Sequence, residues 1–108
     1  MLSLSKHETT VDFWVYILRC SDGSYYTGHT DNLEKRVGEH QAGEIVGYTS
    51  IRRPLTLVFA ERFESREDAI SRERQVKGWG RQKKEALIRG DWQEISRLAS
   101  KQRATHDD

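Results

Sequence analysis

The pattern of apolar and polar residues predicts a β-hairpin near the start of the chain. Residues 13–20, FWVYILRC, are a run of aromatic and β-branched residues, and a shorter run covers 24–29. The turn sequence Ser21-Asp22-Gly23 lies between them. Two such runs on either side of a short turn that contains glycine are typical of paired antiparallel strands. We therefore expect the two runs to form a hairpin.

The length of the hairpin turn decides whether Tyr16 and Tyr26 lie on the same face. With two turn residues, Asp22 and Gly23, the tyrosines lie on opposite faces, because successive side chains of a strand alternate. With three turn residues and Gly23 in the left-handed region, Tyr26 lies opposite Leu18. Tyr16 is then the diagonal neighbour of Tyr26 on the same face. A site that uses both hydroxyls requires the three-residue turn.

After the hairpin, the pattern changes to a helical one. Thr30 and Asp31 are suitable capping residues, and Glu34 completes a capping box with Asp31. Leu33 and Val37 lie four residues apart, as they would on one helix face. These residues predict a helix that begins near Asp31.

The remaining elements follow from turn residues and capping residues in the same way, with caps predicted at Ser65 with Asp68 and at Asp91 with Glu94. The predicted elements are the helix 31–42, the loop 43–54, the strand 55–63 and the helices 66–78, 81–89 and 92–99. The order β-β-α-β-α-α-α predicts an α+β fold in which a small three-stranded antiparallel sheet is flanked by helices. We expect an N-terminal tail at 1–12, a single domain at 13–99 and a polar C-terminal tail at 100–108.

Length and composition restrict the class of protein. The chain has 108 residues, of which 35% are hydrophobic and 32% are charged, a balance typical of one small globular domain. No stretch approaches the roughly 18 apolar residues of a membrane helix, and the start of the chain lacks the apolar core of a secretory signal. We therefore expect a cytoplasmic protein with no membrane partner. A single cysteine, Cys20, excludes an internal disulfide and a zinc site built from several thiols.

Positive charge is concentrated in the second half of the chain. The net charge is only +1, so the total indicates nothing about partners. Between Arg72 and Arg89, however, seven basic residues stand against two acidic ones. Such a segment is either a surface for a polyanion or an ordinary solvated helix face.

One carboxylate interrupts an apolar helix face. Ala69, Ile70 and Val76 define the buried side of the helix predicted at 66–78. At 3.6 residues per turn, Glu73 falls in the middle of that side. A carboxylate in such a place must be paired or must bind a cation. The two alternatives are a buried ion pair with one of the many arginines and a metal ligand.

Four other residues are open to two interpretations. Arg36 and His40 lie four residues apart, so they share a helix face at the border of the core. They are either surface residues that extend over apolar neighbours or members of a site. Tyr16 and Tyr26 are either half-buried aromatic residues of the sheet or members of the same site.

Taken in order, these residues resemble the GIY-YIG nuclease superfamily, especially its short, single-domain bacterial members. The residues that carry the resemblance are Trp14-Val15-Tyr16, then Tyr26-Thr27-Gly28 after nine residues, then Arg36, His40 and Glu73. The resemblance runs from about Phe13 to about Ile88 and is strongest in VYILRCSDGSYYTG and DNLEKRVGEH.

The chain departs from the family pattern in a few places. Trp14 replaces the glycine of the first triplet, and Thr27 replaces the isoleucine of the second. The asparagine that some members carry late in the domain has no counterpart, since Asn32 is the only asparagine. His29 stands where repair-type relatives carry a lysine, so it is either a substrate contact or an exposed strand end.

The resemblance implies a role for each residue in the hydrolysis of a phosphodiester bond. It assigns Glu73 to a single divalent cation, Mg²⁺ or Mn²⁺, and Arg36 to the phosphate oxygens. Tyr16 would accept the proton of the attacking water, with its pKa lowered by the cation and by Arg36. Tyr26 would hydrogen-bond water or phosphate, and His40 would assist proton transfer. The implied function is that of a metal-dependent endonuclease acting on DNA.

The resemblance and the charge pattern also indicate which residues contact nucleic acid. They are Gly28, His29, Arg52, Arg53, Lys77, Lys83 and Lys84. Phosphate contacts do not read base sequence, so selectivity would come from DNA structure or from a partner protein. The choice among single-stranded, duplex and branched DNA stays open, as does the choice between DNA and RNA. The alternative function is a catalytically weak or inactive nucleic-acid-binding module of the same fold, and a protein-interaction domain centred on Trp92 ranks last.

Overall fold

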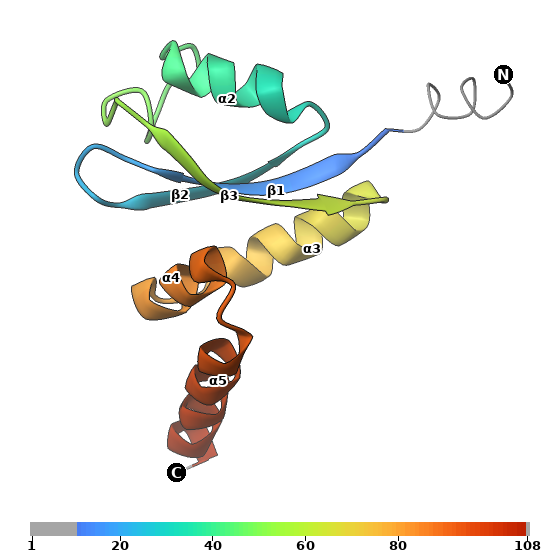
Figure 1. The fold of residues 1–108 in the computed structure, drawn as a ribbon, viewed down its shortest axis with the longest axis vertical. Helices are drawn as coiled ribbons and strands as arrows, with labels where there is room; N and C mark the ends of the chain where they lie inside the picture. The colour runs from blue at the N-terminus through green and yellow to red at the C-terminus, as the bar shows by residue number, and fades with distance from the viewer. Residues whose placement is uncertain (1–10, 108) are drawn as a thin grey trace, which may run out of the picture. The chain divides into compact units, whose positions relative to one another are not determined.

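The structure is a computed structural model that describes residues 11–107, with side chains through residue 100. The strands are β1 (Phe13–Arg19), β2 (Tyr25–Thr30) and β3 (Thr56–Phe63). The helices are α2 (Leu33–Gln41), α3 (Arg66–Lys77), α4 (Arg81–Arg89) and α5 (Trp92–Asp107) (Figure 1). The predicted α+β fold class and its order of elements are confirmed. In this part of the chain, no helix has the length and apolar character that a membrane span requires.

The chain divides after Arg74 into two compact units. The first unit holds the three strands, α2 and the beginning of α3. The second holds the end of α3 and the helices α4 and α5, which pack against each other. All five residues of the predicted catalytic set belong to the first unit. The expectation of a single domain at 13–99 stays a prediction.

The sheet is antiparallel, with the strand order β2-β1-β3. Across the hairpin, Tyr26 pairs with Leu18 and Gly28 pairs with Tyr16. Gly23 has a φ of +85°, and its N–H closes the turn with a hydrogen bond of 2.9 Å. Of the two turn lengths that the sequence left open, the protein has the three-residue turn, and Tyr16 and Tyr26 lie on one face of the sheet.

The central strand β1 is buried because helices cover both faces of the sheet. Helix α2 lies on one face, and the beginning of α3 lies on the other (Figure 1). The core on the α2 face consists of the buried residues Tyr16, Leu18, Cys20 and Leu55 and the partly buried Tyr26, Leu33 and Val37. On the α3 face, Val15, Ile17 and Ala69 are fully buried. Burial of this apolar surface holds each helix against the sheet.

The start of α2 differs from the predicted capping box. The N-cap is Asn32, whose side chain accepts a hydrogen bond of 3.2 Å from the Lys35 N–H. Asp31 forms an ion pair with Arg66 instead, at 3.4 Å. The predicted cap at Asp31 is wrong because the backbone is extended at Asn32, and the residue in that conformation presents its side chain to the free N–H groups of the first turn.

Two other predicted caps are confirmed, and the last helix is longer than expected. Ser65 Oγ accepts a hydrogen bond from the Asp68 N–H, and Asp91 Oδ1 accepts one from the Glu94 N–H, each at 3.1 Å. Helix α5 continues through Asp107, whereas the sequence predicted that it ends at residue 99. The helix extends into the predicted polar tail because each residue added to a formed helix gains a backbone hydrogen bond. Most of the predicted N-terminal tail lies outside the described residues.

Candidate functional site

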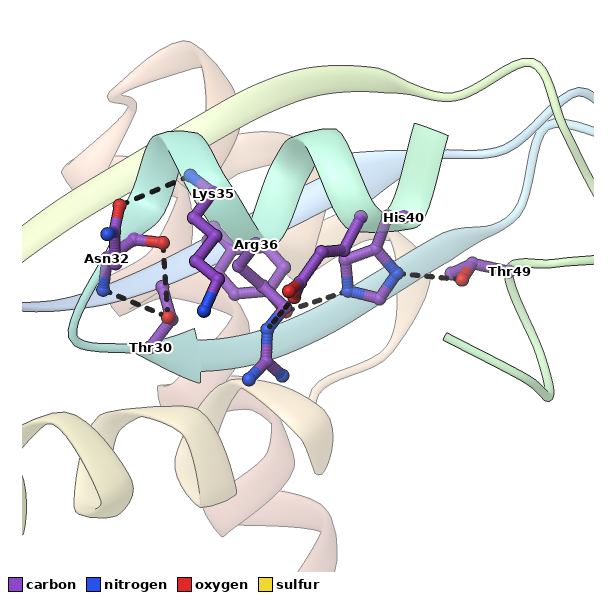
Figure 2. A network of polar contacts seen from close by, with 8 residues as sticks. Thr30, Asn32, Lys35, Arg36, His40 and Thr49 are labelled. Atoms are coloured by element: carbon purple, nitrogen blue, oxygen red, sulfur yellow. Dashed lines mark hydrogen bonds and ion pairs between the residues drawn. The ribbon is translucent and has the colours of Figure 1, made fainter. Parts of the chain in front are cut away.

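A buried series of three side chains joins β1, α2 and the loop that follows α2. Tyr16 Oη lies 2.9 Å from His40 Nε2, and His40 Nδ1 lies 2.8 Å from Thr49 Oγ1 (Figure 2). Each of the three residues is only 1% exposed. Both imidazole nitrogens of His40 therefore have a hydroxyl partner, as a buried polar group requires.

Burial shifts the two titratable groups of this series toward their neutral forms. It raises the pKa of Tyr16 above its ordinary value, and the neighbouring Tyr26 acts in the same direction. Arg36 opposes this rise through its charge and a hydrogen bond, without cancelling it. Burial also lowers the pKa of His40, and the Arg36 charge adds to that effect. Arg36 thus acts on Tyr16 in the expected direction, and in the protein without a cation the effect of burial is larger than that of the Arg36 charge.

Tyr26 and Gly28 border this series from β2. The ring centroid of Tyr26 lies 5.1 Å from that of His40 and 6.4 Å from that of Tyr16. A Cβ at Gly28 would stand 2.6 Å from the Tyr16 hydroxyl oxygen. The phenol of Tyr16 can lie across β2 only because residue 28 has no side chain.

Arg36 lies one helical turn before His40, at the border between the core and the solvent. Its Nε lies 3.2 Å from Glu39 Oε1, and its side chain is 42% exposed (Figure 2). A guanidinium in such a position presents a planar fork that matches the oxygens of a phosphate group.

On the other face of the sheet, Glu73 of α3 meets His29 of β2. His29 Nδ1 lies 2.6 Å from Glu73 Oε1, and the Glu73 side chain is 12% exposed. The carboxylate is therefore nearly buried, as the helical period predicted, and a histidine of the sheet is one of its partners. The negative charge of Glu73 also contributes to the raised pKa of Tyr16, so the two faces interact electrostatically.

Residues 12–86 match the family model of the GIY-YIG catalytic domain. The chain belongs to the GIY-YIG family. This is a nuclease superfamily whose members generally use divalent metals and act on nucleic acid. The resemblance inferred from the sequence is confirmed.

Similar GIY-YIG-type sequences cover most of the chain. A UPF0213 protein of Natronomonas pharaonis is 49% identical over 77 residues, which are 71% of this chain and 91% of the relative. A UPF0213 protein of Staphylococcus saprophyticus is 45% identical over 75 residues, which are 69% of this chain and 92% of the relative. The solution NMR structure of the protein EF2693 from E. faecalis matches with a TM-score of 0.53 and 33% identity, over 73% of this chain and 84% of that one.

The predicted catalytic residues of this GIY-YIG domain fall into two groups. Tyr16, Tyr26 and His40 contact one another on the α2 face of the sheet, with Arg36 beside them. Glu73 projects from α3 onto the opposite face. Both groups adjoin β2, which is an edge strand. The two groups therefore lie on either side of the same edge of the sheet.

The residues predicted to contact nucleic acid lie in three places. Gly28 and His29 lie on β2, Arg52 and Arg53 lie in the loop before β3, and Lys77, Lys83 and Lys84 lie in the second unit. Within that unit, Lys83 Nζ lies 4.6 Å from the ring centroid of Trp79. Burial, together with the charge of Lys77, lowers the pKa of Lys84. The second unit thus combines clustered positive charge with an aromatic ring, a combination typical of nucleic-acid-binding surfaces.

The amino-acid sequence alone does not indicate two residues of the site. Thr49 binds His40, and Tyr48 stacks on Tyr26 with ring centroids 6.3 Å apart. Both lie in the loop predicted at 43–54. No spacing along the chain identifies them, because the path of a loop depends on the packing around it.

The residues present fit a cation that is held by one carboxylate. Among the residues that the structure describes, no three His, Cys, Asp or Glu side chains are grouped so that they could enclose a metal ion. Glu73 alone is compatible with Mg²⁺ or Mn²⁺, which keep several waters and take further ligands from substrate phosphates. A single carboxylate donor therefore suits a cation that the protein shares with the substrate better than a metal ion enclosed by protein ligands.

Proposed function

We propose that this chain is a divalent-cation-dependent endonuclease that hydrolyses phosphodiester bonds in DNA. The observation that carries the proposal is the buried hydrogen-bonded series of Tyr16, His40 and Thr49 beside Arg36, within a GIY-YIG domain. An acid–base pair held in this way supplies the proton transfer that hydrolysis requires. We expect selectivity for DNA structure and not for base sequence, because contacts with phosphates do not read bases.

The pKa shifts define the protonation state before reaction. Tyr16 keeps its proton because its pKa is raised, and in the proposed mechanism its hydroxyl donates to His40 Nε2. His40 is neutral because its pKa is lowered, and the proposed mechanism uses the tautomer with its hydrogen on Nδ1, which donates to Thr49 Oγ1. His40 Nε2 is therefore the acceptor for the Tyr16 proton.

Hydrolysis requires that the attacking water lose a proton. As the water oxygen bonds to phosphorus, its proton passes to Tyr16 Oη while the original Tyr16 proton passes to His40 Nε2. The bond between phosphorus and the leaving oxygen breaks, and that oxygen takes a proton from solvent. This proton relay, from water to Tyr16 and from Tyr16 to His40, allows Tyr16 to accept a proton despite its raised pKa, without first becoming a free phenolate. Tyr26 is close enough to both rings to hydrogen-bond the same water or a phosphate oxygen.

Arg36 and Glu73 supply the charges that the reaction needs. Arg36 binds a phosphoryl oxygen through its guanidinium. Glu73 would hold a divalent cation, which when bound would neutralise charge on the phosphoryl and leaving oxygens. His29 orients the Glu73 carboxylate through their 2.6 Å contact.

Cleavage of labelled single-stranded, duplex, flapped and branched DNAs with Mg²⁺ or Mn²⁺ tests the proposal. We expect cutting that EDTA abolishes and that Glu73→Ala reduces roughly a hundredfold or more. Glu67→Ala is the matched control, because it removes an exposed carboxylate from the same helix. RNA versions of the substrates decide between DNA and RNA. Salt-dependent binding without cutting would establish the nucleic-acid-binding module instead.

A further inference from the structure

The loop between α2 and β3 exposes two aliphatic side chains next to the proposed nuclease site. Val46 is 90% exposed and Ile51 is 78% exposed. They directly flank the turn from Gly47 to Ser50. A single exposed aliphatic residue is ordinary on a protein surface, but two in one short loop call for an explanation.

Hydrogen bonds hold this loop in a defined shape. Ser50 Oγ accepts from the Gly47 N–H at 3.1 Å and donates to the Gly47 carbonyl at 3.0 Å. Arg52 donates to the Tyr48 carbonyl at 2.8 Å, and its Nε lies 3.2 Å from Asp22 in the hairpin turn. The two aliphatic side chains therefore project from a loop whose backbone these hydrogen bonds hold in place.

The same loop supplies residues to the catalytic site. Thr49 binds His40, and Tyr48 stacks on Tyr26 with ring planes 27° apart. The guanidinium carbon of Arg52 lies 3.8 Å from the Tyr48 ring centroid. A continuous series of planar groups thus runs from His40 through Tyr26 and Tyr48 to Arg52. A molecule bound at the loop lies next to one bound in the site.

The chemistry of the loop matches nucleic acid. From Ile45 to Pro54 the sequence contains two arginines and no acidic residue. Apolar side chains beside positive charge suit a ligand that carries flat apolar rings on an anionic backbone. An anionic membrane surface shares part of this chemistry, but the continuity of the loop with a site for phosphodiesters favours nucleic acid.

We propose that Val46 and Ile51 form an apolar wedge that inserts between nucleobases beside the phosphate to be cleaved and unstacks them. The inference rests on the proposed function, because it takes the bases of the nuclease substrate as the occupant of the loop. Arg52 and Arg53 hold the flanking phosphates. The wedge favours substrates whose bases unstack easily, which are single-stranded or distorted regions.

Binding and unstacking are measured in EDTA, so that no cleavage occurs. Wild-type protein and the double variant Val46→Ser, Ile51→Ser are titrated with single-stranded and duplex oligonucleotides that carry one fluorescent adenine analogue. We expect wild-type protein to raise the fluorescence, as unstacking does, and the double variant to lose this rise and to bind roughly tenfold more weakly. The slope of log affinity against log salt concentration should not change, because the phosphate contacts are retained.

Leu57→Ser is the matched control, because Leu57 is an aliphatic residue of β3 that is 39% exposed and lies outside the loop. It should bind and unstack as wild-type protein does. Unchanged fluorescence and affinity in the double variant would overturn the wedge while leaving the proposed nuclease intact. Absence of DNA binding by wild-type protein in EDTA would overturn the wedge, and the cleavage assay with Mg²⁺ or Mn²⁺ decides the proposed nuclease separately. Binding of anionic vesicles that the double variant loses, with DNA binding unchanged, would reassign the loop to a lipid surface.

Discussion

Gly28 and Tyr16 are paired across the β-hairpin so closely that a Cβ at residue 28 would lie 2.6 Å from the Tyr16 hydroxyl oxygen. The same hydroxyl lies 2.9 Å from His40 Nε2. A side chain at residue 28 must therefore displace either the phenol or the strand. The glycine of the second motif triplet therefore sets the position of the hydrogen-bonded Tyr16–His40 pair.

Gly28→Ala should disturb both stability and catalysis. The added methyl group forces the Tyr16 ring away from His40, which we expect to cost about 1–3 kcal/mol of unfolding free energy and to reduce cleavage. Urea unfolding and the DNA cleavage assay measure the two effects. Gly38→Ala is the control, since a Cβ there meets no atom within 4 Å, and alanine in a helix should stabilise by about 0.5–1 kcal/mol. A Gly28→Ala protein as stable as wild type would contradict the packing requirement.

Thr49→Val tests whether the loop orients His40. The substitution keeps the shape of the side chain and removes the hydroxyl, which leaves His40 Nδ1 buried without this partner. We expect a loss of about 1–3 kcal/mol of stability and slower cleavage. Thr49→Ser restores the hydroxyl and should recover most of both. NMR of the imidazole nitrogens reports the tautomer, and an unchanged tautomer with full activity in Thr49→Val would argue against the relay.

Acidification should destabilise the protein through His40. Burial lowers the pKa of His40 in the folded state below its ordinary 6.5, so the unfolded chain binds this proton more readily. The stability that neutral His40 contributes is fully present above pH 6.5 and is lost as the pH falls below it. Urea unfolding at a series of pH values should show a weaker pH dependence in His40→Gln than in wild type. Equal dependence in the two proteins would assign the effect to other groups.

The lysines of the second unit should contribute to nucleic-acid binding through phosphates alone. Replacing Lys77, Lys83 and Lys84 by glutamine should each reduce the slope of log affinity against log salt concentration by about one. Arg97→Gln is the control, because Glu94 holds that guanidinium with contacts of 2.6 and 2.9 Å. Fluorescence anisotropy at several salt concentrations measures the slope. A triple variant with the wild-type slope would place the phosphates on another surface.

Local features of this fold were predictable because they depend on neighbours in the chain. The turn residues Ser21-Asp22-Gly23 limited the hairpin to two registers, and the three-residue turn of the structure gives the one that pairs Tyr26 with Leu18, since turn length sets the register. The 3.6-residue period placed Glu73 on the buried side of α3. The cap at Asp31 was wrong because two adjacent residues can each cap a helix, and the backbone of the folded chain selects Asn32.

Family membership, element order and the presence of the hairpin were thus contained in residue types and spacing, since backbone sterics and side-chain periodicity act over a few residues. The folded chain decided between the two possible hairpin registers. Tertiary packing alone decided which distant groups meet: Thr49 with His40, Tyr48 with Tyr26 and His29 with Glu73. It also decided the protonation of the site. The raised pKa of Tyr16 and the lowered pKa of His40 arise from loss of contact with water, and burial is a property of the folded chain that no spacing of residues specifies.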